Sequence, residues 1–119
     1  MGARRLNLSY DEESDTMYIT FEENRQAMGI ELNEDFFLRI DPETRVPIGL
    51  TIFNYKRQVE NPVPLPLTGL DDLPPDLSEC ILDILKASPV HRFIALVDEK
   101  IPRVRSRVQE IRLTDAVGV

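Results

Sequence analysis

An acidic segment near the N-terminus holds the first residues whose types and spacing could do chemistry. Asp11, Glu13 and Asp15 have the one-three-five spacing of the carboxylate ligands in a calcium loop, and Glu22 falls at position twelve. Such a loop needs a glycine at position six for its sharp turn, but Thr16 stands there. We therefore expect a solvated acidic turn, and keep Asp11, Glu13 and Asp15 as candidate metal ligands.

A second acidic turn contains Asp41 and Glu43, on either side of a proline. If both turns share one end of a sheet, Asp41 would join Asp11 and Asp15. Clustered carboxylates can bind a divalent cation or act as an acid–base pair. This arrangement would indicate a metal-dependent enzyme, which we keep as an alternative function.

The nucleophilic and basic side chains do not form a catalytic pattern. Cys80 lies on the apolar stripe of a predicted helix, so we expect a packed thiol without a catalytic role. His91 has no second histidine in the chain, which favours a structural or surface role over catalysis. The sequence also lacks the glycine-rich and nucleophile-elbow motifs of common cofactor and hydrolase families. We expect no cofactor and favour a binding role over an enzyme.

Three arginines near the C-terminus, Arg103, Arg105 and Arg107, alternate with other residues. On a strand they would share one face at about 7 Å spacing, which could follow successive phosphates. The more common meaning of such a stripe is a solvated edge strand whose charges prevent aggregation, and this is our interpretation. Contact with RNA or with an acidic partner protein is the functional alternative.

The overall charge limits the classes of partner. The 119 residues carry a net charge of −7, which disfavours general binding to nucleic acid or to anionic membranes. The longest apolar run, residues 93–97, is far shorter than the roughly 20 residues of a membrane helix, and the N-terminus does not look like a secretory signal. We expect a cytoplasmic protein without a membrane span, and its single cysteine excludes an intramolecular disulfide.

Alternating apolar and polar residues predict about five short antiparallel strands in the first half of the chain. Short connections without helices between them favour a β-meander. The expected strands cover residues 6–10, 16–21, 30–32, 36–40 and 46–55.

The second half should cover the apolar face of this sheet. A proline-rich segment predicts an extended connector, and apolar residues at three- and four-residue spacing after it predict one amphipathic helix. A strand over 91–97 follows, while 101–113 fits a strand or a helix, with its β-branched residues favouring a strand. We expect a single α+β domain over 1–119, made of a meander (6–57), a connector (58–75), a helix (76–87) and C-terminal strands (91–113).

Two groups of residues resemble a known bacterial family, the one catalogued as domain of unknown function 2283. Its opening motif is similar to Tyr10-Asp11, Asp15, Tyr18-Ile19 and Phe21, and its second motif to Asp41 and Val46-Pro47-Ile48-Gly49-Leu50-Thr51-Ile52. The resemblance covers about residues 6–54. Thr44-Arg45 stand near a position where the family commonly has a glycine turn, and Pro47 interrupts its usual aliphatic pair.

The resemblance implies a small strand-rich module without an established activity, and it assigns no catalytic residue. Some family members are encoded beside small toxin-like proteins, so the resemblance also implies an antitoxin-type role as an alternative. From the residues themselves we expect a small protein-interaction domain that forms a homodimer or other homo-oligomer and could bind a small protein partner.

Overall fold

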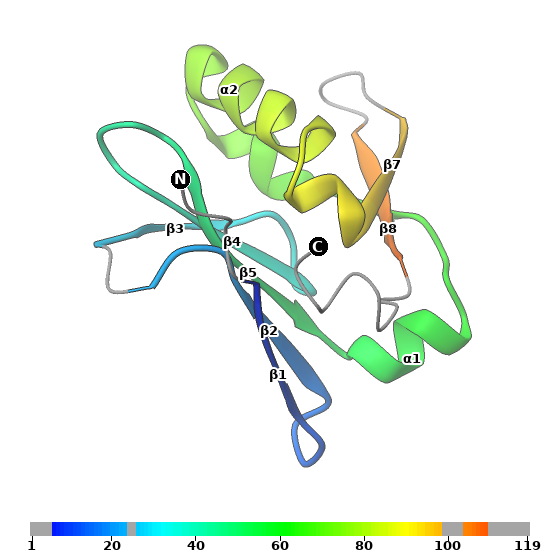
Figure 1. Ribbon diagram of the computed structural model, residues 1–119. Coiled ribbons are helices and arrows are strands. Elements are labelled where there is room, and N and C mark those ends of the chain that lie inside the picture. The colour runs from blue at the N-terminus through cyan, green and yellow to red at the C-terminus, as the bar shows by residue number, and fades with distance from the viewer. Residues whose placement is uncertain (1–5, 24–25, 99–103, 110–119) are drawn as a thin grey trace.

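The computed structural model describes residues 6–23, 26–98 and 104–109 (Figure 1). Its larger layer is a five-stranded antiparallel sheet, in which each neighbouring pair of strands runs in opposite directions. The strands are β1 (Asn7–Asp11), β2 (Thr16–Thr20), β3 (Met28–Glu31), β4 (Phe36–Ile40) and β5 (Pro47–Phe53). The prediction of five antiparallel strands is confirmed.

The order of these strands is not that of a meander. It runs β1-β2-β5-β4-β3, so β5 lies between β2 and β4, and β3 forms the far edge. The predicted sequential order is therefore wrong in one respect. Two local units, the β1–β2 hairpin and the β3–β4–β5 meander, join through β2 and β5, because each has an apolar face that the other extends.

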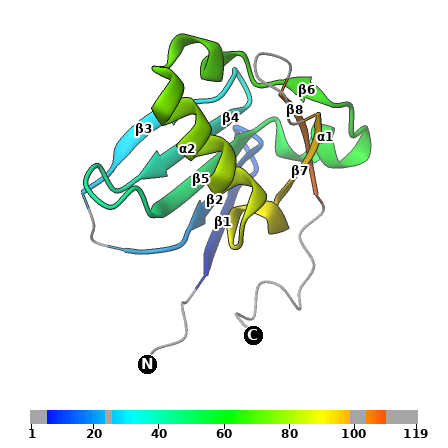
Figure 2. The same cartoon turned by 90° about the horizontal axis from the view of Figure 1, so that it is seen from above.

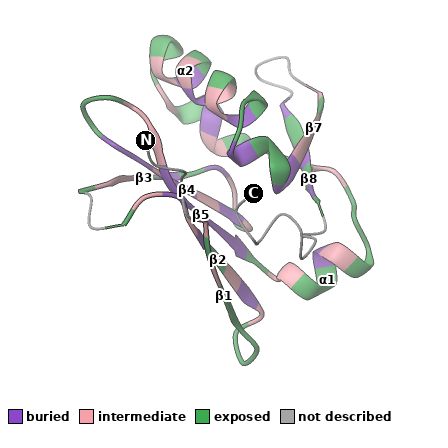
Figure 3. Cartoon of the chain, viewed as in Figure 1, coloured by how far each residue is buried: buried purple, intermediate pink, exposed green. Residues whose placement is uncertain are grey.

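The inner face of the sheet forms most of the core. One row of cross-strand neighbours crosses all five strands and is aliphatic throughout: Leu8, Ile19, Leu50, Leu38 and Ile30. Four of these side chains are buried and Leu8, on the edge strand, is partly buried. The period-two alternation of the sequence thus predicts correctly which residues face inward. Figure 3 shows that burial increases from the edge strand β1, which is almost entirely exposed, to the inner strands.

The helix α2 (Pro75–Lys86) covers this inner face and crosses the strands obliquely (Figure 2). Proline suits the first helical position because the backbone N–H at that position has no acceptor within a helix, so its absence in proline costs no hydrogen bond. Ile81 and Leu85 are fully buried on the side of α2 that meets the core. The predicted helix over 76–87 is confirmed to within one residue at each end. In the described part of the chain no helix is long and apolar enough to cross a membrane.

A short helix, α1 (Tyr55–Glu60), follows β5 directly and is absent from the sequence prediction, which extends the strand to Tyr55. The change of direction occurs at Asn54, whose φ of 56° lies in the left-handed region. Asparagine is among the few non-glycine residues that adopt this conformation readily. The start of the predicted connector (58–75) is therefore helical.

A smaller sheet lies on the same side of the large sheet as α2 (Figure 1). Its order is β6-β8-β7, with β6 at Leu65–Pro66, β7 at Ile94–Asp98 and β8 at Arg105–Val108. The 3-10 helices η1 (Thr68–Asp72) and η2 (Val90–Arg92) precede α2 and β7. The predicted strand over 91–97 therefore begins too early, because residues 90–92 form a helical turn. Within 101–113, residues 105–108 form a strand, whereas 101–103 and 110–113 lie outside the described residues.

The connector joins the two sheets through backbone contacts. The Gly69 N–H donates to the Leu32 carbonyl oxygen at 2.8 Å, and the Leu67 N–H donates to that of Val104 at 2.8 Å. The Asn33 side-chain amide donates to the Pro66 carbonyl oxygen at 3.1 Å. The buried core cluster includes residues from both sheets and α2. That the whole chain behaves as one domain stays a prediction.

Candidate functional site

The acidic turn between β1 and β2 is a tight hairpin whose last paired residues are Asp11 and Thr16. The Asp11 carboxylate accepts a hydrogen bond from the Glu13 N–H at 3.1 Å, which is an ordinary way for aspartate to stabilise a turn. Asp15 adopts a positive φ of 51°, another conformation that aspartate tolerates. The local geometry of Asp11 and Asp15 is therefore explained by the turn itself.

The Asp15 carboxylate joins this turn to α1. One oxygen accepts hydrogen bonds from the Tyr10 hydroxyl at 2.6 Å and from the Lys56 backbone N–H at 2.8 Å. The Asp15 carbonyl oxygen accepts another from the Tyr55 N–H at 3.0 Å. The Tyr10 and Tyr55 rings meet edge to face, with centroids 5.9 Å apart. Asp15 thus satisfies N–H groups at the start of α1 that have no partner within the helix, as a capping residue does.

These contacts shift the pKa values of both side chains. The hydrogen bond to Asp15 raises the pKa of Tyr10 to about 12, with desolvation and the nearby negative charges acting in the same direction. Desolvation works against the ionised form of Asp15, but hydrogen bonds from Tyr10 and from the backbone N–H groups of Lys56 and Arg57 lower its pKa below the ordinary value. At neutral pH, Tyr10 is therefore protonated and Asp15 is ionised. These are the forms in which the Tyr10 hydroxyl can donate and the Asp15 carboxylate can accept the hydrogen bonds that join the hairpin to α1.

Asp41 lies at the opposite end of the sheet. Its carboxylate accepts hydrogen bonds from the N–H groups of Glu43 at 2.8 Å and Thr44 at 3.0 Å, in the turn between β4 and β5. This turn precedes Pro47, whereas the Asp15 hairpin ends beside Phe53 at the other end of β5. The six residue steps from Pro47 to Phe53 along β5 separate the two ends by about 20 Å.

The condition for a shared carboxylate site is therefore not met. Asp11, Glu13 and Asp15 lie in one turn, and Asp41 lies in another at the far end of β5. In residues 6–23, 26–98 and 104–109, no group of three or more histidine, cysteine, aspartate or glutamate side chains could hold a metal ion. The geometry thus offers nothing that favours the metal-dependent alternative.

Cys80 and His91 lie in different surroundings. Cys80 is partly buried on α2 as a free thiol. His91 is exposed in η2, and its carbonyl oxygen accepts a hydrogen bond from the Gln109 side-chain amide at 2.7 Å. Neither side chain has a hydrogen bond to a partner that would activate it, among the residues that the structure describes.

The arginine stripe lies on a central strand. β8 pairs with β6 on one side and with β7 on the other, so the interpretation as an edge strand is wrong. Arg105 and Arg107 are exposed on the solvent face, while Ser106 and Val108 are buried on the other face. Arg103 lies outside the described residues. The predicted shared face of Arg105 and Arg107 is confirmed.

The face of the large sheet that points away from α2, here called the outer face, carries several aromatic side chains. Tyr18 on β2 is 43% exposed and Phe53 on β5 is 38% exposed. Phe37 on β4 is half-buried and lies opposite Thr51, the cross-strand partner of Tyr18. The described helices and the small sheet all lie on the inner side (Figure 1). No described element covers this face.

Sequence reasoning did not single out the outer face, although the signal was present. The alternation places Tyr18, Phe37 and Phe53 on the polar side of their strands, where aromatic residues have no core to join. Singly exposed apolar residues are normal on proteins, but several on one sheet face are a mark of an interaction surface.

One family model matches part of the chain, and its description names no activity. Residues 7–56 match the family model described as "Protein of unknown function (DUF2283)", which confirms the resemblance predicted from the motifs. The matched segment contains the large sheet and ends at Lys56, so it includes the contact between Asp15 and the start of α1. No curated protein and no solved structure matches the chain.

Proposed function

We propose that this protein works by protein association and that its outer face binds a second copy of the chain. The matching family model names no activity, so the proposal is argued from the structure. The observation that carries the proposal is the exposure of Tyr18 and Phe53 on a sheet face that no element of the described residues covers. Burial of apolar area between two copies is the main driving force for association of this kind.

The outer face is flat enough for two sheets to pack against each other. A methyl group on Gly29 would lie 2.3 Å from the tip of the Phe37 ring, and one on Gly49 would lie 2.3 Å from a guanidinium nitrogen of Arg39. Both long side chains therefore lie along the sheet, over the two glycines. Sheets that pack face to face are about 10 Å apart, which requires such low relief.

Charge also favours this face over the rest of the surface. Two copies that each carry a net charge of −7 repel one another in general. On the outer face, the three inner strands contribute one charged side chain, Arg39, while Asp11 and Glu31 lie on the edge strands. Identical acidic chains meet least repulsion where their surfaces carry the fewest charges.

The test is the mass of the protein in solution, measured by sedimentation equilibrium over a concentration series. We expect a species of twice the chain mass of 13.7 kDa for the unmodified protein. Tyr18→Asp should shift the equilibrium to the monomer, because a buried unpaired carboxylate opposes association. Val63→Asp is the matched control, since Val63 is 54% exposed but lies in the connector, away from the sheet.

Circular dichroism and melting curves should show that both variants remain folded. A wild-type protein that stays at the chain mass up to high micromolar concentration would contradict the proposal. So would a Tyr18→Asp variant that dimerises as strongly as the Val63→Asp control.

A further inference from the structure

The strand β7 has one unpaired edge in the small sheet. It pairs with β8 alone among residues 6–23, 26–98 and 104–109. An exposed edge is a template for another strand, because half of its backbone N–H and C=O groups point away from the existing sheet. In antiparallel strands the residues alternate between hydrogen-bonded and non-hydrogen-bonded pairs, and this alternation identifies the residues whose backbone groups point to the unpaired edge.

Two backbone hydrogen bonds independently indicate the direction in which the N–H and C=O groups of Leu96 point. The Gln109 N–H donates to the carbonyl oxygen of Phe93, the residue before β7, at 2.8 Å, so Ala95, two residues further, directs its backbone groups toward β8. The Leu67 N–H donates to the Val104 carbonyl oxygen, so Ser106, two residues further, directs its groups toward β6. The opposite pair of Ser106 and Leu96 is then not hydrogen-bonded, and the backbone groups of Leu96 point to the unpaired edge.

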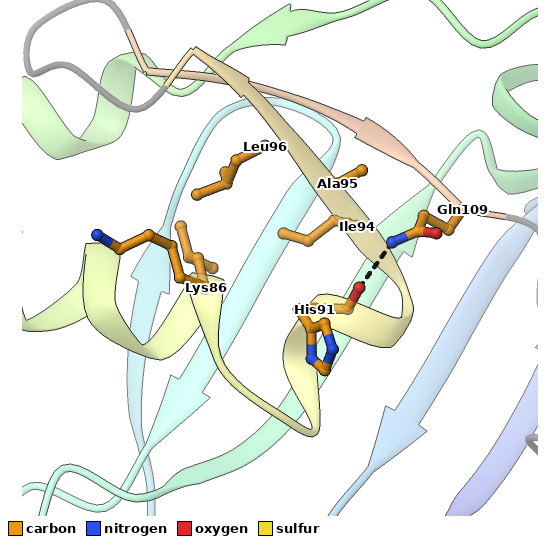
Figure 4. Close-up of a pocket in the computed structure, with 7 residues that line it drawn as sticks. Lys86, His91, Ile94, Ala95, Leu96 and Gln109 are labelled. Atoms are coloured by element: carbon orange, nitrogen blue, oxygen red, sulfur yellow. Dashed lines mark hydrogen bonds between the residues drawn. The ribbon is translucent and has the colours of Figure 1, made fainter.

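A groove of about 430 Å³ adjoins this edge (Figure 4). Its lining residues are Leu85, Lys86, His91, Ile94, Ala95, Leu96 and Gln109. Successive side chains of a strand point to opposite faces, so three consecutive residues can line one groove only where the groove reaches the edge of the strand. Leu85 and Ile94 are fully buried and form its floor, while Leu96 is half-buried and can be reached from solvent.

The charged side chain among the residues that line the groove is Lys86, and no lining residue is acidic. Lys86 also forms an ion pair with Asp83 on the same helix at 3.8 Å. Arg107 lies opposite Ala95, whose small side chain leaves the space above β7 open between Arg107 and the unpaired edge. A strand added at that edge would lie about 10 Å from β8, a separation that an arginine and an acidic side chain can bridge together.

We propose that this groove binds an extended acidic segment of a partner protein, which pairs with the β7 edge at Leu96 and places an apolar side chain against Leu96, above the floor of the groove. Backbone pairing supplies affinity in this mode of recognition, and the alternate side chains supply specificity. A second copy of β7 is the poorer occupant, because pairing two copies would bring Lys86 and Arg107 of each chain near their equivalents.

The experiment is an NMR titration of the ¹⁵N-labelled full chain with two capped pentapeptides, Asp-Val-Glu-Val-Asp and Lys-Val-Lys-Val-Lys. The acidic peptide should move the Leu96 amide resonance and slow its hydrogen exchange, because that N–H gains an acceptor. The basic peptide should bind at least about tenfold more weakly, since it places like charges beside Lys86 and Arg107.

Two neutralised lysines provide the matched comparison. Lys86→Gln should weaken binding of the acidic peptide several-fold, as should Arg107→Gln, whereas Lys56→Gln on α1 should leave it unchanged. Equal affinity for both peptides, or no change at Leu96 with millimolar acidic peptide, would overturn the proposal. So would a shift of the Leu96 resonance with protein concentration alone, because a second copy would then occupy the edge. Tyr18→Asp should bind the peptide like wild type, so this result is independent of the outer face.

Discussion

Gly69 lies at the joint between the family-matched module and the C-terminal part of the chain, so replacing it tests whether the two fold as one unit. A methyl group on Gly69 would lie 1.8 Å from the Glu31 carbonyl oxygen and 3.0 Å from that of Leu32. Real Cβ atoms are essentially never closer than 3.0 Å to such atoms. In Gly69→Ala, η1 and β3 must therefore move apart by more than about 1 Å.

This movement has two costs. Forcing extra volume into a packed contact costs about 1–3 kcal/mol. The separation also lengthens the 2.8 Å hydrogen bond from the Gly69 N–H to the Leu32 carbonyl oxygen beyond its useful range, and an unpaired buried group costs about 1–3 kcal/mol. The same small movement of η1 away from β3 reduces the steric cost while it breaks the hydrogen bond, so the two costs do not add in full. We therefore expect Gly69→Ala to lower the free energy of unfolding by about 3 kcal/mol.

Calorimetry and urea unfolding measure this effect. An unfolding entropy of about 2.1 cal/mol/K per residue gives about 0.25 kcal/mol/K for a chain of this length, so 3 kcal/mol lowers Tm by about 12 °C. Gly29→Ala is the matched control, because its added methyl group meets only the tip of the Phe37 ring, which can rotate away on the outer face. We expect that control to change stability by less than about 1 kcal/mol.

The number of thermal unfolding transitions tests whether the chain folds as a single domain. If residues 7–56 and the C-terminal part form one cooperative unit, Gly69→Ala should unfold in one transition at a lower temperature. A Tm within about 4 °C of wild type would refute the geometric reasoning. Two separate transitions would show instead that the family-matched module folds without its cover.

Two further predictions concern turns of the large sheet. Arg45 has a φ of 61° in the turn between β4 and β5, so Arg45→Gly should relieve left-handed strain and raise stability by about 0.5–1 kcal/mol in urea unfolding, whereas a loss would refute this assignment. Asp15→Ala should cost about 1 kcal/mol through loss of the cap on α1, with dimerisation and peptide binding retained. Because the pKa of Asp15 is lowered in the fold, its contribution should be present above its unfolded pKa near 3.8 and disappear as pH falls through the folded value. Because the pKa of Tyr10 is raised to about 12, the contribution of its hydrogen bond should persist below pH 10 and disappear as pH rises through 12. Melting curves of wild type and Asp15→Ala across this range should therefore differ at neutral pH and converge in acid.

The residues that carry the resemblance to the family have a structural explanation in this chain. Tyr10 and Asp15 hold the first hairpin against the start of α1, and Asp41 organises the turn that leads into β5. Carboxylates at calcium-like spacing therefore do not by themselves indicate a metal site. The same spacing serves hairpin turns, because aspartate accepts hydrogen bonds from the N–H groups two or three residues further along the chain.

Local patterns in the sequence determined the elements and their faces. Alternation identified the strands and the inward row through Leu50, and three- and four-residue spacing identified α2, because both patterns depend on neighbours in the chain. Tertiary structure alone decided that β5 pairs with β2, that the chain bends into α1 at Asn54, and that β8 lies between β6 and β7. Such choices depend on which apolar faces and backbone edges meet across the fold. For the same reason, only the structure showed that, within the described part of the chain, no element covers Tyr18 and no strand pairs with β7 on the Leu96 side.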